Sequence, residues 1–332
     1  MLTNRRWTLA SRPAGWVRED NFALVEAPVP SPNDGEVLVR NRWLSVDPYM
    51  RGRMSDAKSY VKGLEIGDVM VGQTVGDVLE SRHPDLQPGD TVLTQLGWQL
   101  CGCAGGETLT KVDRSRAPLS YYLGMLGMTG MTAYFGLKEI GRPKAGETVV
   151  VSAAAGAVGG IVGQLAKIAG CRAVGIAGGP EKCDYVVKEL GFDACVDYKA
   201  GNIDHELSRV CSDGVDIYFD NVAGPLLDGV LPLMNLASRL VVCGAIADYN
   251  ATDPYAVKGW RSILINRIKV QGMIVFDWSD RYGEAGHALG RYYAEGRLKA
   301  RESVVEGLER APQALIALLK GQNLGKQLVK LA

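Results

Sequence analysis

Apolar and polar residues alternate in two different patterns along this chain, and the pattern changes near Thr129. Closely spaced β-like runs broken by Gly, Pro and Asp predict a compact, mostly β unit before that residue. These runs are GEVLVRNRWLSVD, DVMVGQTVGDVLES and PGDTVLTQLGWQLCG. After Thr129, short apolar runs alternate with helical patterns, which is typical of βαβ units and a parallel sheet.

Six β-branched or apolar runs follow in the second part of the chain: TVVVSA, CRAVGIAGG, ACVDY, VDIYFDN, RLVVCGAI and KVQGMIVF. Between the first two, apolar residues recur at helical spacing at Ile161, Val162, Leu165, Ile168 and Ala169. The segment EKCDYVVKELG predicts a further helix that ends at its glycine. Six strands with intervening helices match two mononucleotide-binding halves, so we predict an α/β fold with a doubly wound parallel sheet of the Rossmann type.

The tail changes pattern again. It predicts a short strand at ESVV, an amphipathic helix around Ala311 to Leu319, a Gly-Asn loop and a last strand from about Gln327. We expect this last strand to return to the N-terminal β unit. The predicted domains are therefore residues 1–128, a Rossmann domain at 129–298, and a C-terminal return at 299–332.

The stretch VVVSAAAGAVGGIVGQLAKIAG resembles a strand, a glycine turn and a helix of a nucleotide-binding segment, yet alanine replaces the first glycine of G-x-G-x-x-G. The motif positions are Ala154, Gly156 and Gly159, with Ala157 and Val158 between the last two. The second glycine admits the pyrophosphate and the third permits close helix packing, while alanine is acceptable at the first if φ stays negative. We predict a dinucleotide site at the start of this helix. Tight packing without a ligand is the alternative.

The end of the next strand decides which dinucleotide is favoured. A site for NAD places Asp or Glu there to bind the ribose 2′-hydroxyl. This chain has Ala177, Gly178 and Gly179 at that turn, and Glu181 and Lys182 just beyond it, with Glu181 the exception to the pattern. An ammonium group pairs with a 2′-phosphate, so we predict NADP(H). The alternative is that Lys182 is a solvated lysine in the first turn of a helix.

The charge balance changes this picture little. Lys plus Arg equals Asp plus Glu at 37 each, which gives no reason to expect nucleic acid or an anionic membrane as a partner. No apolar stretch is long enough to span a bilayer, and we expect a soluble cytoplasmic protein. The cysteines number seven and are scattered along the chain, so we expect them to be reduced thiols. Cys101 and Cys103 lack the further ligands that a zinc site needs. We therefore expect no metal.

Several motifs resemble those of the zinc-independent medium-chain reductases, in the branch of leukotriene B4 12-hydroxydehydrogenase, prostaglandin reductase and curcumin reductase-like enzymes. The motifs are SVDPYMRGRM, GMLGMTGMTAYFGL, SAAAGAVGGIVGQLAKIAGCRAVGIAGGPEKC, FDNVAG, CGAIADYN and NLGKQLVKL. The resemblance implies a GroES-like N-terminal domain, a Rossmann domain and a homodimer. It also implies reduction of an activated carbon–carbon double bond by NADPH in a small α,β-unsaturated carbonyl substrate.

The same resemblance assigns site residues. Lys182 and Tyr198 would contact the adenosine 2′-phosphate, Asn323 would lie near the cofactor phosphates or ribose, and Asn221 of FDNVAG would also bind cofactor. Tyr249 would lie beside the nicotinamide and the substrate carbonyl, and Tyr49 would line the pocket. Without the resemblance, both tyrosines could equally be turn residues that fill a gap.

Zinc alcohol dehydrogenases carry Gly-His-Glu where this chain has IGDVMVGQTVG, and His83, His205 and His287 lie in polar or loop-like stretches without a cysteine cluster. The chemistry is therefore expected to be metal-free. Hydride addition to the β-carbon of an enone moves charge onto the carbonyl oxygen, where a donor such as Tyr249 can stabilise it. A quinone or carbonyl reductase, and a non-catalytic NADPH-binding regulatory protein, are the alternatives.

Overall fold

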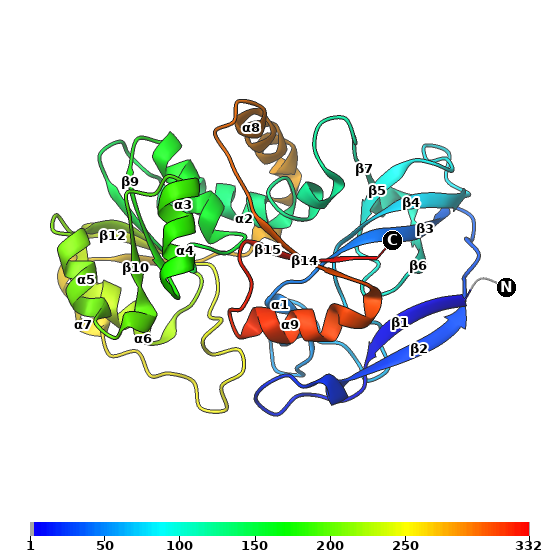
Figure 1. The fold of residues 1–332 in the computed structure, drawn as a ribbon, viewed down its shortest axis with the longest axis horizontal. Coiled ribbons are helices and arrows are strands. Elements are labelled where there is room, and N and C mark those ends of the chain that lie inside the picture. The colour runs from blue at the N-terminus through cyan, green and yellow to red at the C-terminus, as the bar shows by residue number, and fades with distance from the viewer. Residues whose placement is uncertain (1–2, 332) are drawn as a thin grey trace. The chain divides into compact units, whose positions relative to one another are not determined.

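A computed structural model describes residues 3–331, which form two compact units. One unit contains the chain up to Gly124 and from Glu302 onward, and the other is Met125–Arg301 (Figure 1). The chain thus leaves the first unit once and re-enters it for its last strands.

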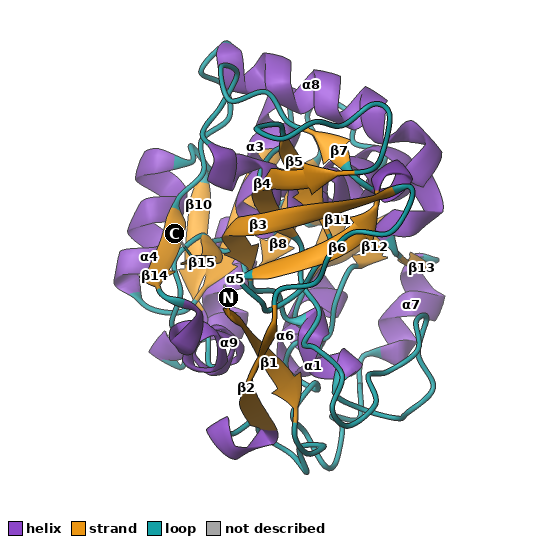
Figure 2. Ribbon diagram, turned by 90° about the vertical axis from the view of Figure 1, so that its right-hand side faces the viewer, coloured by secondary structure: helices purple, strands orange, loops and turns teal. Residues whose placement is uncertain are grey.

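The first unit is built on a seven-stranded sheet in the order β14-β15-β3-β4-β5-β7, in which β6 also pairs with β3 (Figure 2). The prediction of a mostly β unit is confirmed. The last strand, β15, runs antiparallel to β3, with Leu328 opposite Ser45. A separate antiparallel pair, β1 and β2, was not predicted because the residues of β1 are mostly polar and its burial shows no clear alternation. The elements are β1 (Thr3–Leu9), η1 (Glu19–Asn21), β2 (Phe22–Pro28), β3 (Glu36–Ser45), α1 (Tyr49–Arg53), β4 (Thr74–Ser81), β5 (Thr91–Thr94), β6 (Cys101–Gly105), η2 (Gly106–Thr108), β7 (Thr110–Lys111), η3 (Leu119–Leu123), β14 (Glu302–Glu306), η9 (Leu308–Arg310), α9 (Ala311–Leu319) and β15 (Lys326–Lys330).

The second unit is built on a six-stranded parallel sheet in the order β10-β9-β8-β11-β12-β13. This order confirms the predicted doubly wound sheet, whose direction of winding reverses between β8 and β11. The elements are α2 (Met128–Phe135), η4 (Gly136–Gly141), β8 (Thr148–Ser152), α3 (Gly159–Ile168), β9 (Arg172–Ala177), α4 (Pro180–Asp184), η5 (Tyr185–Glu189), β10 (Ala194–Asp197), η6 (Tyr198–Ala200), α5 (Ile203–Val210), β11 (Val215–Asp220), α6 (Gly224–Val230), η7 (Leu231–Leu233), β12 (Met234–Val242), α7 (Trp260–Asn266), β13 (Lys269–Gly272), η8 (Val275–Arg281) and α8 (Tyr282–Ala294).

Burial on both faces explains why the central strands read as unbroken apolar runs. All of β8 is buried. Val150 belongs to a core cluster with Leu207 of α5 and Val230 of α6. Because side chains alternate along a strand, Val149 and Val151 point to the opposite face. The sheet therefore holds the carboxyl ends of its strands, and the loops that follow them, in fixed positions.

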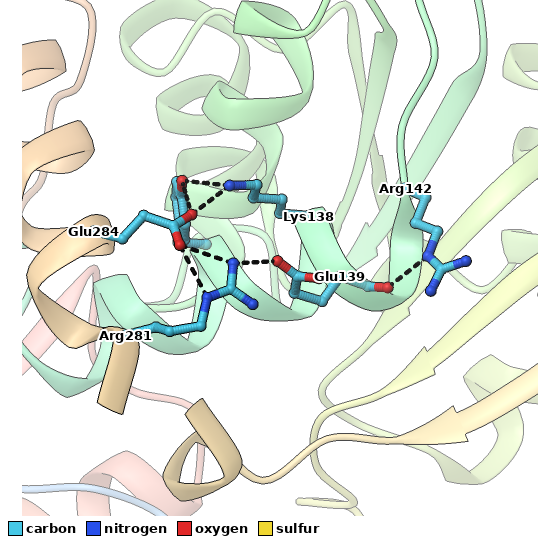
Figure 3. A network of polar contacts seen from close by, with 6 residues as sticks. Lys138, Glu139, Arg142, Arg281 and Glu284 are labelled. Atoms are coloured by element: carbon cyan, nitrogen blue, oxygen red, sulfur yellow. Dashed lines mark hydrogen bonds and ion pairs between the residues drawn. The ribbon is translucent and has the colours of Figure 1, made fainter. Parts of the chain in front are cut away.

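A network of charged side chains fastens α2 and η4 to α8 in the second unit (Figure 3). Glu284 accepts hydrogen bonds from Lys138, from the Tyr134 hydroxyl at 2.8 Å and from Arg281, which also bonds Glu139 at 2.7 Å. The hydrogen bonds from Lys138 and Arg281 lower the pKa of Glu284 to about 2. The network therefore needs Glu284 in its ionised form.

Candidate functional site

The turn after β8 contains one residue in a strained backbone conformation, Ala153. Ala153 has φ +49°, a left-handed conformation that alanine seldom adopts. Ala154, in the first motif position, does not have a positive φ, which meets the condition under which alanine can replace glycine there. A strained residue at such a turn is typical of a site where the backbone must present its groups to a ligand.

Small residues let this turn approach the helix that follows. A Cβ atom on Gly159 would lie 2.4 Å from the carbonyl oxygen of Ala153, so only glycine fits at the start of α3. Ala154 and Gly159 are buried, whereas Gly156, Ala157 and Val158 stay partly exposed. The positive end of the α3 dipole lies behind these partly exposed residues, which makes the turn suited to an anion.

Gly178 and Tyr198 meet beyond the ends of β9 and β10. A Cβ atom on Gly178 would lie 2.8 Å from the Tyr198 ring, so the absence of a side chain makes room for that ring. The Asp197 carboxylate joins the two turns, because it accepts hydrogen bonds from the amides of Gly179 at 2.7 Å and Lys199 at 2.9 Å. The structure thus brings Gly178, in the turn that decides the dinucleotide, next to Tyr198, which the resemblance assigned to the 2′-phosphate.

Two ammonium groups accompany this aromatic ring. Lys182 is half-buried in the first turn of α4, and its pKa is lowered first by burial and then by the charge of Lys199. The Lys199 ammonium lies 6.0 Å from the centre of the Tyr198 ring. The sequence analysis did not name Lys199, although it directly follows Tyr198 in VDYK. Positive charge concentrated in this way favours a doubly charged anion.

Asn221 lies where the sheet changes direction, between the carboxyl ends of β8 and β11. Its side-chain amide donates to the Ser152 carbonyl at 2.8 Å, and its backbone amide donates to the Ser152 hydroxyl at 2.8 Å. The Ser152 hydroxyl in turn donates to Asp220 at 2.8 Å. Burial raises the pKa of Asp220, which also accepts from the Tyr218 hydroxyl at 3.0 Å. Asn221 therefore holds the two central strand ends together.

Tyr249 lies in the long loop that follows β12. Its hydroxyl oxygen accepts a long hydrogen bond, 3.5 Å, from the amide of Ala245. A Cβ atom on Gly244 would lie 3.3 Å from this hydroxyl and 3.2 Å from the Asn221 carbonyl oxygen. The phenol of Tyr249 is thus folded back to the carboxyl edge of the sheet, close to Asn221.

Asp228 of α6 anchors the far end of the same loop. Its carboxylate accepts from the Tyr255 hydroxyl at 2.8 Å, the Lys258 amide at 3.0 Å and the Gly259 amide at 2.7 Å. Burial raises the pKa of Asp228, but these hydrogen bonds outweigh it and hold the pKa below its ordinary value. The sequence analysis missed Asp228, because nothing in a lone helical aspartate indicates partners some thirty residues away.

Tyr49 begins α1 in the first unit, directly after a buried ion pair. Asp47 bonds the Lys326 ammonium at 3.0 Å, with side chains only 5% and 4% exposed. The same ammonium donates to the carbonyls of Val46 at 2.9 Å and Gln327 at 3.1 Å. Burial, followed by the charge of Asp47, raises the pKa of Tyr49 well above its ordinary value. The phenol therefore keeps its proton.

Asn323 also belongs to the first unit, in the turn before β15. Its side-chain amide donates to the Gly325 carbonyl at 2.8 Å. Tyr49 and Asn323 thus share a unit, and the remaining predicted site residues share the other one. Within residues 3–331, no three His, Cys, Asp or Glu side chains are placed to hold a metal ion. No helix in the same range could cross a membrane.

Two family models match this chain: "N-terminal domain of oxidoreductase" over residues 5–112, and "Zinc-binding dehydrogenase" over residues 157–289. NADPH-dependent curcumin reductase of Escherichia coli (strain K12) is 47% identical over 99% of this chain and 97% of that protein. The NADP(+)-dependent 2-alkenal reductase of Nicotiana tabacum is 41% identical over 99% and 97%. Prostaglandin reductase 1 of Mus musculus is 41% identical over 99% and 100%.

A solved structure is similar over the same length. CurA from Vibrio vulnificus in complex with NADPH superposes with a TM-score of 0.95 at 47% identity, covering 99% of each chain. The similarity to these proteins spans both units, so it includes every predicted site residue from Tyr49 to Asn323.

Proposed function

Because the chain belongs to the medium-chain dehydrogenase/reductase superfamily, in the branch of prostaglandin, curcumin and alkenal reductases, we propose that it is an NADPH-dependent enone and alkenal reductase. Its substrates are α,β-unsaturated ketones and aldehydes, of which it reduces the carbon–carbon double bond. The observation that carries this proposal is the full-length similarity to an NADPH-dependent curcumin reductase and to an NADP(+)-dependent 2-alkenal reductase.

The residues at the carboxyl edge of the parallel sheet fit NADPH. The partly exposed Gly156, Ala157 and Val158 and the start of α3 suit the pyrophosphate. Lys182 and Tyr198 suit the adenosine 2′-phosphate, and Lys199 adds a second positive charge there. NADH lacks this phosphate, so these residues would favour NADPH.

Tyr249 is the proposed hydrogen-bond donor to the substrate. When bound, NADPH supplies the hydride. Negative charge then grows on the carbonyl oxygen of an enone reduced at its β-carbon, and the Tyr249 hydroxyl would stabilise it. Asn221 would position this end of the site, because it ties β8 to β11 beside the Tyr249 loop. A proton for the α-carbon would come from water.

Tyr49 and Asn323 are the residues of the first unit that we propose to contact substrate and cofactor, respectively. The raised pKa of Tyr49 keeps its phenol neutral, so it would shape the substrate pocket and donate a hydrogen bond rather than act as a base. Asn323 would bind cofactor through the turn that its own side chain stabilises.

A deuterium-transfer experiment tests the proposed reaction. The protein would be given an enone and NADPH that carries deuterium at the transferred position, and the product would be examined by mass spectrometry and NMR. We expect a saturated ketone with deuterium on the former β-carbon. An allylic alcohol with deuterium on the carbinol carbon would contradict the proposal and indicate a carbonyl reductase.

We also propose that two copies of the chain associate through the edge of the parallel sheet. The strand β13 forms this edge of the sheet, near α7 (Figure 2). All of β13 is exposed, and Trp260 and Leu264 of α7 are 64% and 78% exposed. Unpaired edge strands and clustered apolar side chains are typical of an interface. Light scattering should give the mass of a dimer, and Val270→Lys should shift it toward the monomer; a monomeric wild type would contradict the proposal.

We further expect the protein to act in the cytoplasm. All of its cysteines are free thiols in the structure, and reducing compartments favour that state.

A further inference from the structure

Two cysteines of the second unit lie in direct contact. The sulphur atoms of Cys183, on α4, and Cys195, on β10, are 3.1 Å apart. Both residues are half-buried, so neither lies in the closed core of the unit. Every other cysteine of the described chain is also a free thiol, but only this pair has a sulphur–sulphur contact among the hydrogen bonds of residues 3–331.

The sequence places these sulphurs together through strand alternation. Val196 and Val174 point into the core cluster that α5 and α6 cover, so Cys195 and Gly175 point to the other face. A Cβ atom on Gly175 would lie 3.3 Å from the Cys195 sulphur, so the missing side chain of Gly175 leaves room for this thiol. The helix α4 packs over the same strands and brings Cys183 to it.

The contact makes the two sulphurs chemically different. The Cys195 thiol donates a hydrogen bond to the Cys183 sulphur, which lowers the pKa of Cys183 and raises that of Cys195. Burial raises the pKa of Cys171 and Cys211 to about 11 and that of Cys243 to about 12. Since the thiolate is the reactive form, Cys183 is the nucleophile of the pair and those three remain inert.

We propose that Cys183 and Cys195 are a peroxide-sensitive modification site, at which a reversible disulfide weakens nucleotide binding by the adjacent Lys182 and Tyr198. The effect on nucleotide rests on the proposed function; the disulfide itself does not. The Cys183 thiolate attacks one oxygen of hydrogen peroxide, the O–O bond breaks, and the product is a sulfenic acid and hydroxide, which takes a proton to become water. The Cys195 sulphur then attacks the Cys183 sulphur, its proton leaves with the displaced oxygen as a second water, and the S–S bond forms. Two thiols are oxidised and one peroxide is reduced.

Disulfide formation must move α4. The sulphurs would close from 3.1 Å to about 2 Å, a shift of about 1 Å. Cys195 cannot supply this movement, because β10 is hydrogen-bonded to β9 along its length. The helix α4 has more freedom, because none of the residues Pro180–Asp184 is buried, although the helix continues into η5, where Tyr185 and Val186 are buried. Lys182 precedes Cys183 directly, so its ammonium would move with the new bond.

Peptide mapping tests the disulfide. The reduced full-length protein would be treated with hydrogen peroxide, alkylated and digested with trypsin without reduction. Cleavage at Lys182, Lys188 and Lys199 separates the two cysteines, so the disulfide should appear as CDYVVK joined to ELGFDACVDYK. The joined peptide should disappear after treatment with a thiol reductant. Absence of this peptide from peroxide-treated wild type would overturn the proposal, and this result needs no variant.

Variants and a binding measurement test the consequence. Cys183→Ser and Cys195→Ser should abolish the joined peptide, whereas Cys103→Ser, a half-buried thiol of β6, should leave it unchanged. The dissociation constant for NADPH, measured by fluorescence without substrate, should rise about tenfold on oxidation of wild type and return on reduction, since a displaced charge-assisted bond is worth about 1.5 kcal/mol or more. The same peroxide treatment should not change it in Cys183→Ser.

The outcomes separate this proposal from the proposed function. A disulfide with unchanged NADPH affinity would overturn the link to the nucleotide site. Reduced wild type that fails to bind NADPH would instead overturn the proposed function, while the joined peptide would still decide the disulfide.

Discussion

At the scale of single residues, we propose that Lys182 carries the choice of cofactor. Lys182→Ala should weaken NADPH by about 10- to 100-fold, the equivalent of about 1.5–3 kcal/mol for a charge-assisted hydrogen bond, and should change NADH little. Dissociation constants for both nucleotides check this. Lys188→Ala is the matched control, because this exposed lysine lies just after the same helix and pairs with Asp184. Equal losses for NADPH and NADH would contradict the assignment.

Tyr249 carries the chemical step in our account. Tyr249→Phe should lower kcat by about 10²-fold or more, as expected when one donor to a developing oxyanion is lost, and should leave the dissociation constant for NADPH unchanged. Tyr122→Phe removes a hydroxyl that donates to the Asp113 carbonyl in the first unit, and should not affect kcat. An unchanged kcat in Tyr249→Phe would remove this residue from the reaction.

Residue identity alone indicated part of the candidate site. The motif at Ala154 and Gly159 and the lack of an acid at Ala177–Gly179 are local signals, and the structure places these residues at one edge of the sheet. The strain falls one residue earlier, on Ala153, which no motif indicates. Asp228 and Lys199 could not be found, because their roles depend on partners that only the folded chain brings near.

At the scale of elements, the loop after β12 depends on Asp228 for its shape. Asp228→Asn replaces a charged acceptor of three hydrogen bonds by a neutral one, so we expect faster proteolysis within residues 243–259. Because Tyr249 lies in this loop, kcat should also fall several-fold, with less effect on NADPH affinity. Limited proteolysis followed by mass spectrometry checks the first effect. An intact loop together with a reduced kcat would show that Asp228 acts in another way.

The charged network between α2 and α8 makes the stability of the fold depend on pH in the acidic range. The pKa of Glu284 is about 2 in the folded protein against an ordinary 4.5. A carboxylate whose pKa is lower in the folded than in the unfolded protein stabilises the fold at pH values above its ordinary pKa. This contribution is lost as the pH falls from about 4.5 toward 2.

Glu284→Gln should therefore lower the unfolding temperature at neutral pH, and its difference from wild type should shrink as the pH falls through this range. Thermal unfolding at several pH values measures it. Glu26→Gln, on an exposed position of β2, is the control and should show little difference at any pH. A pH-independent difference for Glu284→Gln would contradict the role of the ionised carboxylate.

Elements were predicted best where the pattern was strong. The central strands β8, β9 and β11 have mostly apolar runs, because both faces of the sheet are covered there. The pair of β1 and β2 was missed, since β1 is mostly polar in sequence and its buried residues do not alternate. The π-helical turns η4 and η5 were also missed, because one extra residue in a turn leaves the apolar spacing nearly unchanged.

At the scale of the whole molecule, the order of strands and helices along the sequence could be predicted, but the pairing of the strands could be predicted only in part. The change of pattern near Thr129 lies close to Gly124, where the structure ends the first segment of the first unit. The parallel order follows from the handedness and the repetition of βαβ units. In the first unit, however, β15 pairs with β3 although most of the sequence separates the two strands. The Lys326–Asp47 ion pair strengthens that contact. No local pattern contains this register.

The most direct test of the whole account is the loss of nicotinamide absorbance with an enone, its saturated ketone and a quinone, each supplied with NADPH and, separately, with NADH. We predict rapid oxidation of NADPH with the enone alone, slow oxidation of NADH, and a saturated ketone as the product identified by mass. Turnover with only the quinone, or equal rates with NADPH and NADH, would contradict the central claim that this chain is an NADPH-dependent reductase of activated carbon–carbon double bonds.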